Sequence, residues 1–312
     1  SGELATRRRP PELLTRDVVA KAINSERDAG RASEHGGAYL DISWRTPEDI
    51  KKKLPGMYHQ FKELAAVDIT TTKMEVGPTA HYVMGGVKVD PESQESTISG
   101  LYAAGEAATG LHGANRLGGN SLSDLIVFGK IAGESAASRA AAMNGFTEIP
   151  EDEIADVISE TLAPFAREEG ENPAAVVEDL REMMQEKVGI IRTGKLLQEA
   201  LKDLDELEVR AAITSPGGSR IYNPGWHQAL ELGAMIDVSR MCALAALERE
   251  ESRGGHTRDD FPVPDHSHWG KVNSVISLSE DGSMNIEHTT YPPIDEEFKA
   301  LLDAEDLHEE ES

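Results

Sequence analysis

The stretch GLYAAGEAATGLHGANRLGGNSL, residues 100–122, decides how the centre of this chain folds. An apolar run over residues 98–104 predicts a buried strand that ends at Gly105 and Glu106. A glycine-rich loop follows over residues 110–119, and a helix then begins. Ligands bind at the carboxyl ends of strands in open α/β sheets, so the Glu106 carboxylate is expected where it can accept hydrogen bonds from sugar-like hydroxyl groups.

The helix after the loop is predicted from Leu122 to about Ala142. Ser121 is its expected N-cap, and Asp124, three residues further on, completes a capping-box pattern. The helix opening at Asn120, Ser121 and Leu122 presents free N–H groups and the positive end of the helix dipole. This end of the helix is therefore suited to a negatively charged part of a ligand.

Two further side chains near this stretch suit an anionic ligand. Arg116 is a permanent cation that can bind a carboxylate through two parallel hydrogen bonds. His81 precedes a Gly-Gly turn and can donate a hydrogen bond to a second carboxylate. Taken singly, such residues are more often a surface arginine and a turn histidine, but their occurrence around the least polar loop of the chain indicates a ligand site. His112, in the same loop, is interpreted as structural.

The composition restricts the class of function. The 312 residues include 31 Lys and Arg against 56 Asp and Glu, a formal charge of −25, which argues against nucleic acid as a partner. The acidity suits a protein kept soluble in high salt, and a halophilic source and ordinary acidic solubility are equally favoured. No apolar run approaches the ~20 residues that cross a bilayer, and no signal peptide is expected.

The single cysteine, Cys242, lies in an apolar run and is expected in the core. One cysteine excludes an internal disulfide framework and a four-cysteine cluster, so redox chemistry requires a bound cofactor. His256, His266 and His268 lie near acidic residues, but their spacing is not that of a usual metal site, and no metal is predicted.

Helical periodicity dominates the rest of the chain. Near the N-terminus the sequence predicts a helix over residues 15–29, a short strand over 39–42 and a helical region over 47–64 that a proline interrupts. Residues 151–251 are predicted to form a helical bundle, and residues 272–288 a hairpin. The helices expected in the bundle span residues 151–169, 173–187, 193–211 and 227–250.

Several runs resemble the flavoprotein subunit of succinate dehydrogenase and fumarate reductase. They are HYVMGGV at residues 81–87, the stretch at 100–122, and TRDVVAKAI at 15–23. ESRGGHTRDD at residues 251–260 also resembles that family. The likeness spans essentially all of the chain as the C-terminal half of a longer protein, so the N-terminal FAD-binding half is expected to be missing.

The resemblance implies an α/β plus α fold. It would contain the C-terminal part of a Rossmann-like FAD-binding domain and part of an α+β capping domain, followed by a helical bundle domain. The implied boundaries are 1–75 for the partial capping domain, 76–145 for the FAD-binding part, 146–250 for the bundle, and 251–312 for a C-terminal domain with an acidic tail.

The resemblance also implies which residues would bind the FAD cofactor. Glu106 would bind its ribityl or ribose hydroxyl groups. Asn120, Ser121 and Leu122 would lie at the cofactor, and the backbone of the last two would contact the isoalloxazine ring.

In the same way, His81 and Arg116 would bind the dicarboxylate substrate, and Arg16 would transfer the proton. A guanidinium group is taken as permanently protonated, so Arg16 would act as a relay between the substrate and a neighbouring carboxylate. From the residues alone, a simple ion pair of Arg16 with Asp17 is the first interpretation. By charge alone, the arginines at residues 7–9 are alternative candidates for the proton-transfer residue.

The expected function is FAD-dependent interconversion of succinate and fumarate, with hydride transfer at flavin N5 and proton transfer through Arg16. Electrons would pass to an iron–sulfur subunit, and membrane anchor subunits would hold the complex at the cytoplasmic face of the cell membrane. The alternatives are L-aspartate oxidase, a soluble fumarate reductase and a non-catalytic truncated fragment. The sequence from Arg116 to Gly119 resembles the dehydrogenase and reductase version more closely. The chain by itself is not expected to hold FAD tightly or to turn over.

Overall fold

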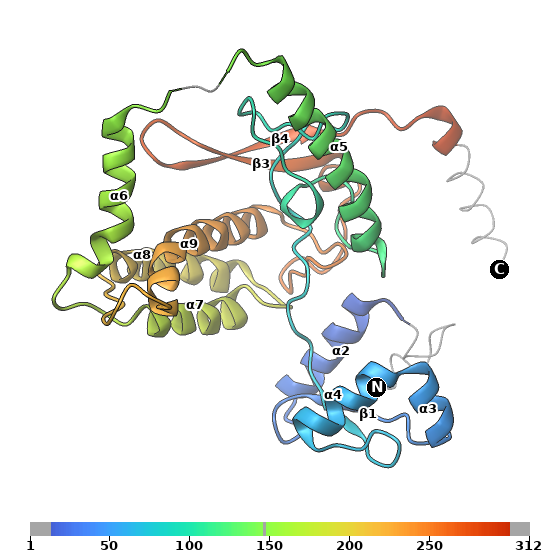
Figure 1. Cartoon of the computed structure of the whole chain (residues 1–312). Coiled ribbons are helices and arrows are strands. Elements are labelled where there is room, and N and C mark those ends of the chain that lie inside the picture. Colours follow the sequence, from blue (N-terminus) through green and yellow to red (C-terminus); the bar gives the residue numbers. More distant parts are fainter. Residues whose placement is uncertain (1–13, 146–147, 300–312) are drawn as a thin grey trace. The chain divides into compact units, whose positions relative to one another are not determined.

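The structure is a computed structural model that describes residues 14–145 and 148–299 (Figure 1). The chain divides into two compact units, Ser1–Gly145 and Phe146–Ser312. Each unit combines helices with a small two-stranded antiparallel sheet, so the fold is mixed helix and sheet. None of the helices in the described ranges has the length and apolar character that crossing a bilayer requires.

The N-terminal unit begins with helix α2, Arg16–Asp28, which agrees with the helix predicted there. Thr15 occupies the N-cap position, but its side chain makes no capping hydrogen bond. Strand β1, Ala38–Leu40, pairs antiparallel with β2, Met74–Val76. This short sheet therefore connects two segments that lie more than thirty residues apart in the sequence.

Helices α3, Pro47–Lys53, and α4, Pro55–Ala65, lie between the two strands and are separated at Pro55, as predicted. The side chain of Thr46 accepts a hydrogen bond from the Asp49 backbone and caps α3. A small buried cluster holds this part of the unit together; it consists of Ile50, Ile69 and Met74.

The predicted buried strand over residues 98–104 is wrong. Among the described residues this segment pairs through an isolated bridge between Glu95 and Tyr102, and Ile98 is 66% exposed. A strand is stable only where a neighbour pairs its backbone groups along its length, and apolar composition alone does not supply that neighbour. The chain then enters a single 3₁₀ turn, Gly105–Ala107.

Helix α5, Asn120–Ala142, begins two residues before the predicted start, with Gly119 at its N-cap. Gly119 has a φ of 82°, a backbone conformation that glycine adopts without strain. The predicted capping box is also wrong. Ser121 lies inside the first turn, and the Asp124 side chain bonds Tyr82 instead of the helix terminus.

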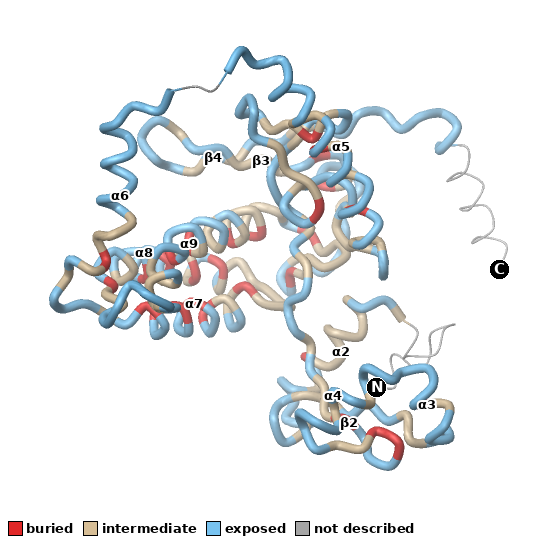
Figure 2. The backbone as a smooth tube through the Cα atoms, viewed as in Figure 1, coloured by how far each residue is buried: buried red, intermediate tan, exposed pale blue. Residues whose placement is uncertain are grey.

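The C-terminal unit contains the predicted bundle. Helices α7, α8 and α9 pack on one another, and α6 contacts α9. Figure 2 shows buried positions recurring along all three packed helices. The helices span Glu151–Ala166 (α6), Pro173–Lys187 (α7), Gly194–Ala212 (α8) and Pro224–Glu248 (α9). The shared core comprises Val176, Val177, Leu180, Met183, Val188, Leu197, Ala200, Leu204, Leu207, Leu232, Ile236, Ala243 and Ala246.

Side-chain caps explain where three of these helices begin. Asn172, Thr193 and Asn223 each accept a hydrogen bond from a backbone N–H in the first turn of α7, α8 and α9 respectively.

Cys242 is less buried than the sequence predicts. Its neighbour Ala243 is fully buried, so Cys242 is turned about 100° away around α9 and is half-buried.

The predicted hairpin is present at the end of the described chain. Strand β3, Val272–Leu278, pairs antiparallel with β4, Met284–Thr290, with Val275 opposite Glu287. The turn between them contains Gly282 with a φ of 83°, which agrees with the predicted Asp-Gly turn. A 3₁₀ turn, η3, Trp269–Lys271, leads into β3.

Candidate functional site

A buried polar cluster joins three segments of the N-terminal unit; Tyr82, His112 and Asp124 form it. The Tyr82 hydroxyl donates to Oδ2 of Asp124 at 3.1 Å. Nε2 of His112 lies 3.1 Å from the same hydroxyl and 3.2 Å from the same carboxylate oxygen. Asp124 is only 5% exposed, and the His112 ring packs edge-on against the Tyr82 ring. We call this group the Tyr82 cluster.

The surroundings of the Tyr82 cluster also change the pKa of its tyrosine. Burial, together with the hydrogen bond to the Asp124 carboxylate, raises the pKa of Tyr82. The phenol therefore remains a neutral hydrogen-bond donor at neutral pH. Because a buried carboxylate is costly unless its oxygens accept hydrogen bonds, the three side chains hold one another in place.

Arg116 lies on this cluster. Its guanidinium carbon is 4.8 Å from the centroid of the Tyr82 ring, which is a cation–π contact. Nη1 of Arg116 donates to the carbonyl of Leu117 at 3.2 Å. Nε of Arg116 is buried and has no hydrogen-bond partner in the described part of the chain. A buried N–H without an acceptor costs free energy, so Arg116 would gain by turning this group toward an acceptor such as a carboxylate oxygen.

Glu106 is tied to the segment that carries His81. The backbone N–H of Val83 donates to Oε1 of Glu106 at 2.8 Å. Glu106 itself is exposed, and so is His81. The carboxylate is therefore fixed at one oxygen and accessible to a ligand, and the chain just after His81 is fixed with it.

Glycines allow the same two segments to approach closely. The backbone N–H of Val87 donates to the carbonyl of Ala107 at 2.8 Å. A Cβ atom at Gly86 would lie 2.6 Å from that carbonyl oxygen, and one at Gly105 would collide with the side chain of Leu125 on α5. A larger residue at Gly86 would push apart the segments that carry His81 and Glu106, and one at Gly105 would displace the Leu125 side chain and strain a backbone whose φ is 68°.

Helix α2 is connected to the loop that carries Arg116. Nδ2 of Asn115 donates to Oδ1 of Asp17 at 3.0 Å, between residues 98 positions apart in the sequence. Lys21 lies 3.9 Å from the other oxygen of the same carboxylate. Arg16 and Arg116 are the direct neighbours of the two bonded residues, and the Arg16 side chain is exposed.

The first turn of α5 has fewer free donors than the sequence predicts. The N–H of Asn120 donates to the carbonyl of Leu117 at 3.1 Å, and the N–H of Leu122 donates to the carbonyl of Gly119 at 3.2 Å. The Ser121 amide is therefore the best placed of the three predicted groups to bind a ligand.

All the residues predicted to act on substrate or cofactor lie in the N-terminal unit. Arg116 contacts the ring of Tyr82, and His81 precedes Tyr82 in the chain, but no contact joins the side chains of His81 and Arg116 among the described residues. Arg16 is connected to the Arg116 loop through the contact of its neighbour Asp17 with Asn115. The sequence analysis missed the roles of Tyr82, Asp17 and Asn115, because no spacing rule relates contacts between such distant segments.

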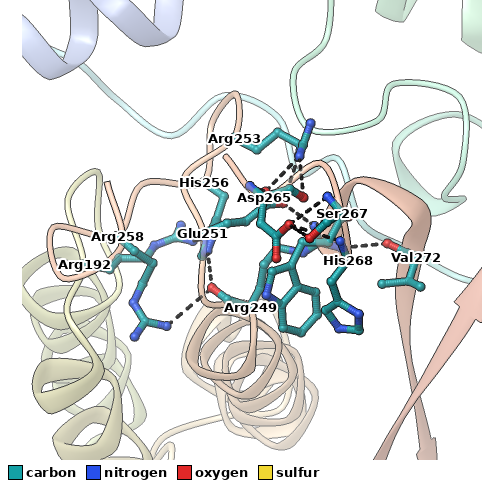
Figure 3. A network of polar contacts seen from close by, with 11 residues as sticks. Arg192, Arg249, Glu251, Arg253, His256, Arg258, Asp265, Ser267, His268 and Val272 are labelled. Carbon is teal, nitrogen blue, oxygen red and sulfur yellow. Dashed lines mark hydrogen bonds and ion pairs between the residues drawn. The ribbon is translucent and has the colours of Figure 1, made fainter. Parts of the chain in front are cut away.

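A second polar network lies in the C-terminal unit (Figure 3). Glu251 is fully buried and accepts hydrogen bonds from Arg249 at 2.6 Å and from Arg253 at 2.9 Å. Burial acts to raise the pKa of Glu251, but the bonds from Arg253, from the Asp265 backbone and from Arg249 outweigh it, and the net shift is downward. The buried charge of Glu251 is thus compensated by two arginines, and removing either partner would leave it less well paired.

His256 belongs to the same network (Figure 3). Nδ1 of His256 lies 3.1 Å from Nη1 of Arg192, and Nε2 lies 3.0 Å from the carbonyl of Arg249. Burial, together with the neighbouring arginines, lowers the pKa of His256 to about 4. Among the described residues, no group of three or more His, Cys, Asp or Glu could hold a metal ion.

Comparison with known proteins now identifies the family. Residues 5–122 match the family described as "FAD binding domain", and residues 177–302 match "Fumarate reductase flavoprotein C-term". The chain belongs to the family of fumarate reductase and succinate dehydrogenase flavoprotein subunits. The resemblance expected from the sequence is thereby confirmed, and Glu106, Arg116 and Asn120 all lie within the first matched region.

Individual relatives and one solved structure support the same family assignment. The chain is 34% identical to the "Fumarate reductase flavoprotein subunit" of Escherichia coli, covering 96% of the chain and 51% of that protein. It is 35% identical to the "8-methylmenaquinol:fumarate reductase flavoprotein subunit" of Wolinella succinogenes, covering 88% and 46%. The solved structure "Mycobacterium smegmatis Sdh1 in complex with UQ1" matches with a TM-score of 0.77 and 51% identity, covering 92% and 48%. The chain thus spans about half the length of these relatives.

Proposed function

We propose that the protein containing this chain is the flavoprotein subunit of a succinate dehydrogenase or fumarate reductase, which uses FAD to interconvert succinate and fumarate. The observation that carries the proposal is the contact of the Arg116 guanidinium with the ring of Tyr82, the residue after His81, within the region that matches the FAD-binding family. Bound FAD supplies a hydride acceptor and donor.

The finer fold assignment is part of the proposal. We assign residues 1–75 to a partial capping domain, 76–145 to part of the FAD-binding domain, 146–250 to the bundle domain and 251–312 to the C-terminal domain.

The local structure fits a flavin cofactor. Gly86 permits a backbone approach that no larger residue would allow, Gly105 adopts a φ of 68° that favours glycine, and Glu106 keeps an accessible carboxylate beside them. A carboxylate of this kind accepts hydrogen bonds from the ribityl or ribose hydroxyl groups. The α5 terminus from Asn120 to Leu122 directs its dipole and the Ser121 amide toward negative charge, as a reduced ring would require.

The same region fits a small dicarboxylate. Succinate and fumarate carry a carboxylate at each end, so the site needs a donor at both ends. Arg116 offers a guanidinium group whose buried Nε has no acceptor in the described chain, and His81 offers an exposed imidazole. Fixing both ends orients the substrate, and such orientation is worth about 7–11 kcal/mol of barrier in favourable cases.

Arg16 is the proposed proton-transfer residue. Oxidation of succinate removes a hydride from one carbon and a proton from the next, and reduction of fumarate adds both back. Arg16 takes or delivers that proton only in passing, because a guanidinium does not rest neutral in a protein. Asp17, its neighbour, is bound by Asn115 and so keeps the start of α2 at the Arg116 loop.

The proposal includes partners and location. The chain has one cysteine in total, too few for a four-cysteine cluster, so electrons would leave through an iron–sulfur subunit. The relatives carry the name of a flavoprotein subunit, which implies assembly with other subunits. We propose an iron–sulfur partner and membrane anchor subunits, with the flavoprotein attached peripherally at the cytoplasmic face.

The deciding experiment expresses the complete protein with its FAD and measures dye-linked succinate oxidation, fumarate reduction and L-aspartate oxidation in parallel. Turnover with succinate and fumarate, and none with aspartate, is expected. Faster turnover with aspartate would assign the protein to the aspartate oxidases instead. A folded, FAD-loaded protein that is inactive on all three substrates would contradict the proposal altogether.

A further inference from the structure

We propose that Tyr82, held by His112 and Asp124, is a positioning residue that sets both substrate-binding groups of the site, His81 and Arg116. This inference rests on the proposed function, because it concerns how the dicarboxylate is bound. It adds a residue that the sequence analysis did not single out, and it assigns a purpose to a buried polar cluster away from the reacting atoms.

The first step is the fixed orientation of the Tyr82 ring. Its hydroxyl is bonded to Asp124 at 3.1 Å and lies 3.1 Å from Nε2 of His112. The His112 ring packs edge-on against it, with the two planes at 77°. A phenol bonded at its hydroxyl and packed at one side has no second position within the cluster. Asp124 in turn belongs to α5, so the ring is fixed relative to that helix.

The second step is the effect on Arg116. Its guanidinium lies on the fixed ring at 4.8 Å, and its Nη1 is bonded to the Leu117 carbonyl. Nε of Arg116 is a buried donor that has no acceptor in the described chain. The ring face therefore decides where Arg116 presents its hydrogens to a carboxylate.

The third step concerns His81, which is joined to Tyr82 by one peptide bond. On the far side of Tyr82, the Val83 N–H is bonded to Glu106 at 2.8 Å. The chain around His81 is thus held by one side-chain contact at Tyr82 and one backbone contact at Val83. Loss of the Tyr82 hydroxyl would release the first of these and let both substrate groups move.

The test uses three variants of the complete FAD-loaded protein. Tyr82→Phe keeps the ring under Arg116 and removes the hydroxyl, whereas Tyr82→Leu removes both. Tyr102→Phe is the matched control, because Tyr102 lies in the same unit and outside the cluster. The measurements are KM and kcat for fumarate, and calorimetric binding of malonate, a dicarboxylate that does not react. Thermal unfolding checks that each variant is folded.

The KM for fumarate and the Kd for malonate are expected to rise about 3- to 10-fold in Tyr82→Phe and about 10- to 100-fold in Tyr82→Leu, in line with the loss of a hydrogen bond and then also of a cation–π contact. The kcat is expected to change less, and Tyr102→Phe to match the wild type. Wild-type KM and Kd in Tyr82→Leu, or a loss of kcat alone, would overturn the positioning role. A wild-type protein that is folded but neither binds malonate nor reduces fumarate would instead overturn the proposed function.

Discussion

The two units differ in what holds them together. The C-terminal unit has a continuous aliphatic core shared by α7, α8 and α9, whereas the buried cluster of the N-terminal unit consists of Ile50, Ile69 and Met74. Around residues 81–124 the N-terminal unit relies on polar contacts between side chains, chiefly the Tyr82 cluster. Stability and proposed chemistry therefore lie mainly in different units.

Helices α5 and α8 express this contrast directly. In α8 the inner positions, such as Leu197 and Leu204, are fully buried. In α5 the buried positions are Asp124 and Ala132, while Ile126 is 75% exposed. Substitutions in the N-terminal unit should therefore change ligand binding and turnover, and substitutions in the C-terminal unit should change unfolding.

The largest expected effect is on turnover in the N-terminal unit. Arg16→Ala should lower kcat for fumarate reduction by about 10³-fold or more, the upper range for loss of a proton-transfer group. The flavin absorbance and the unfolding midpoint should stay as in the wild type, because Arg16 is exposed. Arg27→Ala, in the last turn of the same helix, is the control for charge. Ordinary activity in Arg16→Ala would end the assignment.

The next effect is on stability in the C-terminal unit. Leu204→Ala removes a fully buried side chain and should lower the free energy of unfolding by about 3 kcal/mol, from lost burial and the cavity left behind. Malonate affinity of the folded protein should not change. Leu230→Ala, at a position on α9 that is 42% exposed, should cost far less. Urea unfolding measures both, and equal costs would contradict the view of a single close-packed core.

The pH dependence of stability should follow His256. Its pKa is about 4 in the folded protein against an ordinary value of 6.5, so the unfolded chain binds the proton more readily between these values. Stability should therefore fall as the pH drops from 6.5 to about 4, by on the order of 2 kcal/mol after allowance for partial exposure. His256→Asn should flatten the unfolding free energy over this window. His266→Asn, at an exposed histidine, should leave the slope intact.

The smallest expected effect is on malonate binding, when the contact between α2 and the Arg116 loop is removed. Asp17→Ala and Asn115→Ala each remove the bond of 3.0 Å, and a double-mutant cycle on malonate binding should give a coupling of about 1 kcal/mol. Additive effects of the two changes would mean that this bond does not help to assemble the site.

The same contrast explains what the sequence could predict. The helices of the bundle were predicted within a few residues, because apolar periodicity is a local signal. The buried strand at residues 98–104 was not, because a strand depends on a partner that composition does not reveal. Asp124 matched a capping-box pattern, and only the contact with Tyr82 shows its actual role.

The assignment of the family from the sequence is confirmed, and the roles of Arg16, His81, Glu106 and Arg116 remain predictions that the variants above address. These residues were found because they lie in contiguous runs. Their supporting contacts join positions 12 to 98 residues apart and could be found only in three dimensions.

The end of α9 has a consequence for the dynamics of the C-terminal unit. This helix ends at Arg249 in an extended conformation, and Nη1 of Arg258 donates to the carbonyls of Ala246 and Leu247, while its other nitrogens pair with Asp260. Asp260 also accepts from the Gly194 amide at the start of α8. The buried guanidinium of Arg258, with its partner Asp260, therefore connects the C-terminal end of α9 to the N-terminal end of α8. Amide protons at both helix ends should exchange with solvent as one cooperative unit.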